Sequence, residues 1–167
     1  MTAEAWIELF VRIGLVILFF PFSALDKVIS FGHAVKQAQE MFPRALAIVM
    51  ILVGLGIEIF ASLGVVTGIA DRLAALILAG YCAATAMLFK RWWEPGDFWS
   101  DPDGKARGLF WDFLKNFSLA AGFLLIVVGT QGQGFHAFLS DPLGSSHPYA
   151  TTAPAAPTAY SLEIPHG

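Results

Sequence analysis

Residues 45–66 read ALAIVMILVGLGIEIFASLGVV, an apolar run that contains a single charged residue, Glu58. A helix needs about 20 mostly apolar residues to cross the hydrocarbon core of a bilayer, and this run is long enough. Inside lipid every backbone polar group has to be hydrogen-bonded internally, and a helix meets that requirement. The run is therefore predicted to be a membrane-spanning helix, which places the chain among integral membrane proteins.

Three other stretches match this run in length and apolar character, namely residues 6–29, 69–89 and 109–130. The composition agrees, because hydrophobic residues make up 56% of the 167 residues and charged residues only 14%. Soluble domains have about 45–50% apolar and about 25% charged residues. We therefore expect an all-α fold: an integral membrane four-helix bundle with antiparallel up-down topology, forming one domain over residues 1–130.

The connections between the predicted helices differ in kind. Residues 30–44 mix apolar and polar side chains, which predicts a short amphipathic turn or helix at the membrane interface. Only Thr67 and Gly68 separate the second helix from the third, so these two helices must form a tight antiparallel hairpin. Residues 90–108 combine basic, acidic, proline and glycine residues and are predicted to form a solvated loop.

The composition changes after residue 130. Residues 131–167 are rich in Ala, Pro, Ser and Thr and contain no Lys or Arg. Such a segment cannot bury enough apolar surface to offset the entropy lost on ordering. We expect a disordered C-terminal tail, with ordering against a partner left open.

The distribution of basic residues predicts the orientation in the membrane. Eight of the ten Lys and Arg residues belong with the two longer connections, and only Arg12 and Arg72 belong with the termini and the short hairpin. Loops rich in Lys and Arg stay in the cytoplasm, so both termini are expected to be non-cytoplasmic. The acidic N-terminus lacks the positive charge of a secretory signal peptide, and the first apolar stretch is expected to be retained as a helix.

Several classes of function are disfavoured by the same composition. The net charge of −3, without a basic cluster interleaved with aromatic residues, argues against nucleic-acid binding. Cys82 is the single cysteine, which excludes an internal disulfide and a CxxC pair. The four histidines do not have the spacing of a metal site. We also see no residue set that would hold haem, flavin or an iron–sulfur cluster tightly.

Charged residues inside the predicted helices are the candidates for a site, because each costs free energy at membrane depth. At a rise of about 1.5 Å per residue, Arg12 lies about 9 Å and Glu58 about 12 Å from the non-cytoplasmic boundary. Arg72 is close to the same boundary in the third helix. We expect Arg12, Glu58 and Arg72 to form a polar intramembrane cluster. A structural ion pair between Glu58 and either arginine, and a role in ligand or proton handling, both remain open.

A second polar cluster is expected at the cytoplasmic end of the bundle. Its members close the first helix or open the fourth: Asp26, Lys27, Asp112, Lys115 and Asn116. Asp112 and Lys115 are three residues apart and share a helix face, so they are able to pair. Lysines near a helix end also extend to the interface without any specific partner, which is the simpler interpretation of Lys27, Lys90 and Lys115.

Five motifs occur in order along residues 8–130. They are Arg12-Ile-Gly-Leu-Val-Ile-Leu-Phe19, Ser23-Ala-Leu-Asp-Lys27, Glu58 in the second helix, Gly68-Ile-Ala-Asp-Arg72-Leu-Ala-Ala75, and Lys115-Asn116. Taken together, they resemble the DoxX family of small four-helix bacterial membrane proteins. Asp26 and Asp71 depart from the small or hydroxyl residues expected at their positions.

The resemblance implies a protein of the bacterial inner membrane that works near respiratory or redox chemistry. Some members of the family are linked to quinone-reducing systems, including a small subunit of thiosulfate:quinone oxidoreductase, and others to redox-stress assemblies. The first hypothesis is therefore an accessory subunit of a membrane redox or quinone-linked complex, with a protein partner and a quinone at an interface. On this hypothesis the chain is a non-catalytic subunit.

Two alternatives remain. In the first, the chain is a small proton-coupled transporter or permeation protein in which Glu58 carries the proton. In the second, Arg12, Glu58 and Arg72 only lock the bundle together.

Overall fold

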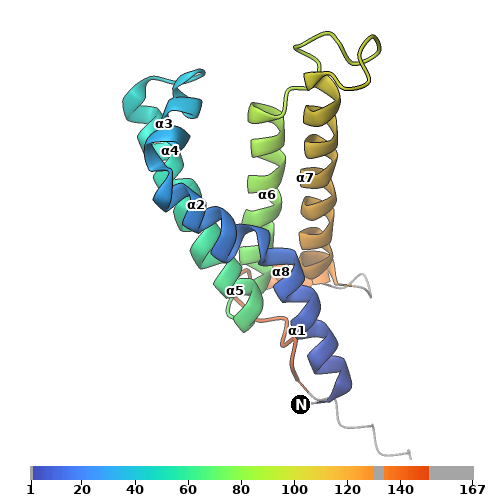
Figure 1. The fold of residues 1–167 in the computed structure, drawn as a ribbon. Coiled ribbons are helices and arrows are strands. Elements are labelled where there is room, and N and C mark those ends of the chain that lie inside the picture. Colours follow the sequence, from blue (N-terminus) through green and yellow to red (C-terminus); the bar gives the residue numbers. More distant parts are fainter. Residues whose placement is uncertain (1, 130–133, 151–167) are drawn as a thin grey trace, which may run out of the picture.

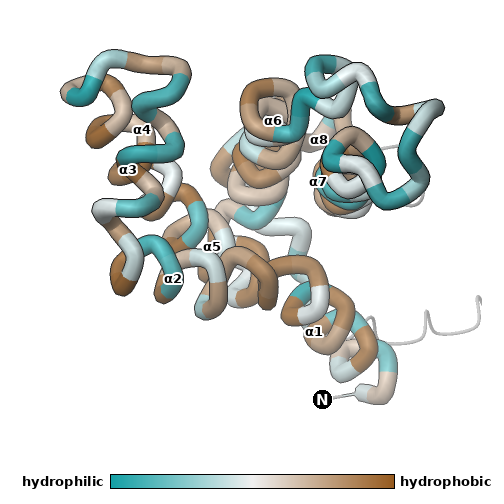
Figure 2. The backbone as a smooth tube through the Cα atoms, turned by 45° about the horizontal axis from the view of Figure 1, so that its top comes forward, coloured by the Kyte–Doolittle hydropathy of each residue, from teal (hydrophilic) through white to brown (hydrophobic). Residues whose placement is uncertain are grey.

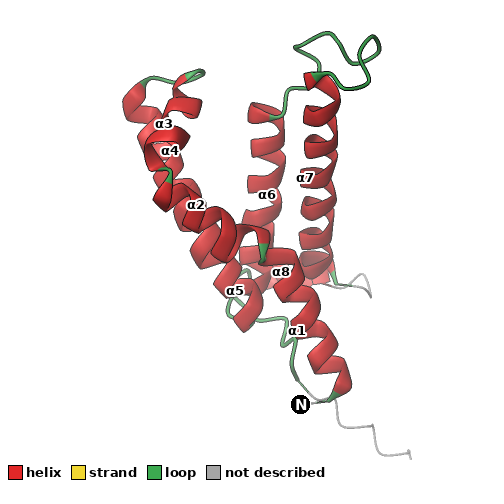
Figure 3. Cartoon of the chain, viewed as in Figure 1, coloured by secondary structure: helices red, strands yellow, loops and turns green. Residues whose placement is uncertain are grey.

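A computed structural model describes residues 2–129 and 134–150 of the chain. Four helical spans in it are long and apolar enough to cross a membrane: Ala3–Ile29, Arg44–Thr67, Asp71–Phe89 and Lys105–Val128. Each overlaps one of the four predicted stretches, and the described residues form helices and loops without strands (Figures 1 and 3). The prediction of an all-α four-helix membrane fold is confirmed.

The four spans form two antiparallel pairs (Figure 1). The first span comprises α1 (Ala3–Val16), η1 (Leu18–Ser23) and α2 (Ala24–Ile29), and the second comprises α4 (Arg44–Gly56), η2 (Ile57–Ala61) and α5 (Ser62–Thr67). The short helix α3 (Phe31–Gln39) connects them, where an interfacial turn or helix was expected. The other pair consists of α6 (Asp71–Phe89) and α7 (Lys105–Val128), which pack side by side and are joined by the loop 90–104.

The two pairs contact each other at one end of the molecule and diverge toward the other (Figure 1). We call the first end, which carries the N-terminus and the α5–α6 turn, the terminal end. The second, which carries α3 and the loop 90–104, is the loop end. The contacts of α6 with the second span are concentrated at η2 and α5. A cavity lies between the pairs on the side of the loop end.

Both helices of the first pair are interrupted near the middle. In η1, Phe20 has non-helical φ and ψ of −128° and 121°, and Pro21 follows it. Proline lacks an amide hydrogen and its ring clashes with the preceding turn, so it interrupts a regular helix. In η2 the backbone widens to a π-helical turn that contains Glu58. Such turns are frequent at functional sites, and the two interruptions lie against each other.

The core lies where the two pairs meet. Its buried members come from all four spans and consist mainly of small and branched apolar residues: Val16, Phe19, Ala61, Val65, Ala74, Ala75, Leu78, Ala79, Cys82, Ala120, Phe123 and Val127. The hairpin between α5 and α6 is as tight as predicted. Gly68 ends α5 with a φ of +77°, a left-handed conformation that glycine adopts without steric cost.

The spans consist mainly of hydrophobic residues, and the polar residues gather toward the helix ends and in the loop 90–104 (Figure 2). Phe10, Phe60 and Leu125 are 77%, 75% and 60% exposed. Large apolar side chains at this exposure would be unfavourable in water but suit contact with lipid tails. The exposed face is therefore the lipid-contacting surface of a multi-pass membrane protein.

Part of the predicted tail lies on the bundle. Residues 134–140 form α8 (Gly134–Ser140), which contacts α7, and Phe138 packs against the core. Residues 141–150 then cross the terminal end as an irregular segment. The tail was expected to be disordered unless a partner ordered it. Residues 134–150 instead pack against helices of the same chain. Residues 131–133 and 151–167 of the predicted tail lie outside the described residues.

Candidate functional site

Two ion pairs, each with a buried carboxylate, occupy different levels of the bundle. The first joins Arg12 of α1 to Asp71, the first residue of α6, at 2.7 Å between Nη1 and Oδ2. Their side chains are 3% and 0% exposed. The carboxylate at the start of α6 also interacts favourably with the positive end of the helix dipole. We call this group, together with its hydrogen-bond partners, the terminal-end cluster.

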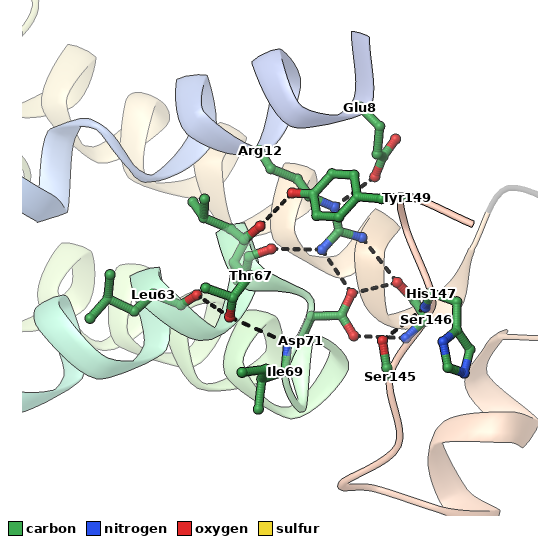
Figure 4. Close-up of polar contacts among 12 residues, drawn as sticks. Glu8, Arg12, Leu63, Thr67, Ile69, Asp71, Ser145, Ser146, His147 and Tyr149 are labelled. Carbon is green, nitrogen blue, oxygen red and sulfur yellow. Dashed lines mark hydrogen bonds and ion pairs between the residues drawn. The ribbon is translucent and has the colours of Figure 1, made fainter. Parts of the chain in front are cut away.

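Hydrogen bonds satisfy both charges of the terminal-end cluster (Figure 4). Arg12 donates from Nε to Glu8 and from Nη1 to the carbonyl oxygen of Val65, both within 2.8 Å. Its Nη2 donates to the Ser146 hydroxyl at 3.0 Å, and the Ser146 amide donates to Asp71 Oδ1 at 2.8 Å. The Ser146 hydroxyl also donates to Asp71 Oδ2. Ser146 thus bridges the two charges.

The segment 141–150 is held over this cluster at a second point. The Tyr149 hydroxyl donates to the carbonyl oxygen of Val66 near the end of α5 (Figure 4). Burial raises the pKa of Tyr149 and is the largest effect. The charge of Arg12 lowers this pKa by a smaller amount, and the charges of Glu8 and Asp71 raise it further. The hydroxyl therefore stays protonated and remains a donor at neutral pH. The segment closes the terminal-end cluster against solvent.

The second ion pair joins Lys27 of α2 to Glu58 of η2, at 2.7 Å between Nζ and Oε1. The same carboxylate oxygen accepts hydrogen bonds from the Ser23 hydroxyl and from the Tyr81 hydroxyl of α6, both at 2.9 Å. Lys27 also donates to the Ser23 oxygen at 2.7 Å. We call these four residues the central cluster. It links the two interrupted helices of the first pair to α6.

The central cluster is less completely satisfied than the terminal-end cluster. Glu58 Oε1 accepts three hydrogen bonds, whereas Oε2 is buried and has no partner among the described residues. The Ser62 hydroxyl, four residues along the same helix, is buried and unpartnered in the same sense. A buried acceptor without a donor costs about 1–3 kcal/mol. An unmatched oxygen on a buried charge is therefore a candidate contact for a ligand.

A cavity of about 660 Å³ opens between the diverging helix pairs, and all four residues of the central cluster line it. Its walls are mainly apolar and come from η1, α4 and α6, including Phe19, Val49, Met50, Ala84 and Leu88. Polar residues line it toward the loop end: Asp26, Ser30, His33, Gln37, Lys90 and Asn116. Ligand sites are typically cavities of about 300–1,000 Å³ with apolar walls and a few convergent polar groups.

The structure separates the three residues that were predicted to form one intramembrane cluster. Arg12 pairs with Asp71, Glu58 pairs with Lys27, and among the described ion pairs neither arginine is joined to Glu58. Arg12 bonds at the level of Val65, seven residues beyond Glu58, or about 10 Å along a helix. The depth estimate treated the helices as parallel rods, whereas the first span is inclined and broken at Pro21.

Arg72 takes no part in either cluster. Its Nε is buried without a hydrogen-bond partner in the part of the chain that the structure describes. The acidic neighbour Asp71 is the residue that joins the terminal-end cluster. Asp71, which departs from the residue type expected from the family resemblance, is thus the hairpin residue that pairs with Arg12.

The cluster expected at the loop end is present in part. Asp112 accepts from Lys90 at 3.0 Å and from Lys115 at 3.4 Å, and the Asn116 amide donates to the carbonyl oxygen of Asp112. Lys27 is drawn away from this group to Glu58. Helical side chains lean toward the N-terminus of their helix, and for Lys27 that direction leads from the loop end toward the bundle centre. Asp26 is exposed and lines the mouth of the cavity.

Ser23, Tyr81, Asp71 and Ser146 were not proposed as site residues from the sequence. Ser23 belongs to the quoted motif Ser23–Lys27, which was the signal for it, whereas Tyr81 lies in an apolar helix outside the quoted motifs and carried none. For Asp71 the available signal was its acidic side chain, at a position where the family resemblance leads us to expect a small or hydroxyl residue. Within residues 2–129 and 134–150, no group of three or more His, Cys, Asp or Glu side chains is arranged to hold a metal ion.

The fold and the two clusters define a multi-pass membrane protein with a polar-ended cavity between two helix pairs. The model of the DoxX family matches residues 7–91, just over half of the 167 residues. The chain therefore belongs to the DoxX family. The match covers most of the first three spans and includes both ion pairs, whereas α7 and the segment 141–150 lie beyond it. No curated protein and no solved structure matches the chain.

Proposed function

We propose that this protein is an accessory membrane subunit that holds a quinone-type ligand in its central cavity for a redox partner. The observation that carries the proposal is the cavity itself. It combines apolar walls with a buried cluster of hydrogen-bonding groups at its inner end. A quinone has the matching chemistry, because its ring is apolar and its oxygen atoms accept hydrogen bonds.

Lys27 is the residue that would orient such a ligand. Its side chain is 19% exposed, while that of Glu58 is 2% exposed, so the ammonium group is the more accessible part of the ion pair. Two of its three N–H donors bond to Ser23 and Glu58. The third is available to a ligand oxygen.

The accessory role and the location are supported by family membership and by charge. Some members of the family are linked to quinone-reducing systems, which supports a redox enzyme as the protein partner. The basic residues of α3 and of the loop 90–104 lie at the loop end. With this end in the cytoplasm, the protein sits in the bacterial inner membrane with its N-terminus on the opposite side.

Ligand binding in the cavity is tested by filling it. Ala84→Trp places a large ring at a position that lines the cavity, and Met87→Trp places the same ring on a 53% exposed position of the same helix. In nanodiscs, a short-chain benzoquinone should bind to the wild type and to Met87→Trp, and at least about 10-fold more weakly to Ala84→Trp. Equal binding to all three proteins would remove the cavity from the proposal.

The partner is tested separately. Purification in a mild detergent followed by mass spectrometry should recover a redox enzyme in stoichiometric amount. A stable particle that contains this chain alone would contradict the accessory role but leave ligand binding untouched.

One observation favours proton handling as a second candidate function, namely that Glu58 lines a cavity and one of its two carboxylate oxygens has no hydrogen-bond partner among the described residues. A transporter that moves a proton on Glu58 should show proton-coupled flux in liposomes that Glu58→Gln abolishes. Unchanged flux in both proteins would exclude this candidate.

A further inference from the structure

The unused donors and acceptors of the central cluster determine what a ligand must supply. The Tyr81 hydroxyl uses its hydrogen on Glu58 Oε1, and the Ser23 hydroxyl uses its hydrogen on the same atom. Lys27 retains one N–H donor, as described above. The acceptors that remain are Glu58 Oε2, which is buried and has no hydrogen-bond partner among the described residues, and the lone pair of the Tyr81 oxygen. The cluster therefore offers a ligand one hydrogen-bond donor, the free N–H of Lys27, and needs from it at least one donor for Glu58 Oε2.

A ligand carbonyl satisfies only half of this requirement. It accepts the free N–H of Lys27 but has no hydrogen for the carboxylate. A hydroxyl on an aromatic ring does both, since its oxygen accepts from Lys27 and its hydrogen is donated to Glu58. Oε2 is buried, and because the carboxyl torsion of a glutamate is broad, we expect a rotation of the carboxyl group to bring Oε2 to such a hydroxyl. A hydrogen bond to a carboxylate is also stronger than one between neutral groups.

We infer that the cavity binds the reduced, hydroquinone form of its ligand more tightly than the oxidised quinone, with the Glu58 carboxylate as the group that selects it. This inference rests on the proposed function. One extra hydrogen bond to a buried charge corresponds to about a 10-fold or larger difference in Kd. For a two-electron couple, a 10-fold preference raises the midpoint potential of the bound ligand by about 30 mV. The site then makes its bound quinone a better electron acceptor.

The experiment measures the Kd of a short-chain benzoquinone and of its hydroquinone for the protein in nanodiscs, by calorimetry under anaerobic conditions. The expected result is that the hydroquinone binds at least about 10-fold more tightly. Equal affinities, or tighter binding of the quinone, would overturn the inference and leave the proposed function standing. If neither form binds, the proposed function fails and the inference fails with it.

Glu58→Gln identifies the selecting group. The amide replaces one acceptor oxygen by a donor, so the preference should fall below about 3-fold or reverse toward the quinone. Glu94→Gln is the matched control, because it makes the same change at a carboxylate that is 51% exposed and outside the cavity lining. A preference that survives Glu58→Gln would assign the selectivity to another group.

Removing Glu58 also leaves the charge of Lys27 without its partner. The double variant Lys27→Met/Glu58→Gln keeps the cluster neutral and guards against loss of folding. It should retain no preference for the hydroquinone. A persistent 10-fold preference in the folded double variant would contradict the inference as directly as in the single variant.

Discussion

The Arg12–Asp71 and Lys27–Glu58 pairs both have an N–O distance of 2.7 Å, yet their surroundings differ. At the terminal end, the backbone carbonyl of Val65, the Glu8 side chain and Ser146 satisfy the charges, and the segment 141–150 covers them. In the centre, one carboxylate oxygen accepts three hydrogen bonds while the other accepts none from the described residues, and a cavity reaches the cluster.

The difference separates a structural pair from a candidate site within one protein. A buried charge stabilises a fold only when its hydrogen bonds are complete, because the cost of removing it from water is large. The terminal-end cluster meets this condition, and the central cluster does so only when something else supplies a donor. The four predictions below test this contrast.

The largest loss of stability is expected at the terminal end. Asp71→Ala leaves the Arg12 charge buried at 3% exposure, and breaking such a pair costs about 3–5 kcal/mol of the free energy of unfolding. Denaturant titration in detergent measures the loss. The double variant Arg12→Met/Asp71→Leu removes both charges and should recover most of it. A double variant as unstable as Asp71→Ala would show that the pair itself, not the stranded charge, provides the stability.

A smaller loss is expected in the centre. Glu58→Gln weakens charge-assisted hydrogen bonds worth about 1.5–3 kcal/mol, but the cavity gives Lys27 access to solvent or ligand and limits the cost. The same titration measures the change. A loss equal to that of Asp71→Ala would mean that the central cluster is as closed as the terminal-end cluster.

Tyr149→Phe should lower the free energy of unfolding by about 0.5–1.5 kcal/mol through loss of one hydrogen bond. It should also change the pH dependence. Because burial raises the pKa of Tyr149 in the folded state, that state holds the proton more tightly. The contribution is complete below the ordinary tyrosine pKa of about 10 and is lost as pH rises through the higher folded value. Thermal unfolding at pH 8 to 11 should show a steeper alkaline decline in the wild type than in Tyr149→Phe.

The smallest effect is expected at the loop end. Lys115 is 73% exposed and lies 3.4 Å from Asp112, and exposed pairs of this kind contribute about 0–1 kcal/mol. The midpoint of thermal unfolding of Lys115→Ala should therefore lie within about 4 °C of that of the wild type. A larger shift would mean that this end of the bundle carries a third structural cluster.

Hydropathy alone was enough to predict the four spans, because runs of the length found at residues 45–66 satisfy the requirement for crossing lipid. The same reasoning singled out Arg12 and Glu58 as buried charges. It failed for their partners, since pairing depends on the inclination of the first span and on the breaks at Pro21 and Glu58, neither of which changes the hydropathy. Ser146 was missed because a polar segment gives no sign of the surface on which it folds.

The position of the segment 141–150 late in the chain has a consequence for the order in which the terminal-end cluster forms during synthesis. Arg12 enters the membrane in the first span, Asp71 follows with the third, and Ser146 is synthesised 75 residues after Asp71. Until the fourth span has been inserted, the first charge has no complete set of partners. The terminal-end cluster can therefore form fully only once Ser146 has been synthesised and has reached the terminal end of the bundle. A chain truncated after α7 would keep its four hydrophobic spans but would leave the Arg12–Asp71 pair without the hydrogen bonds of Ser146.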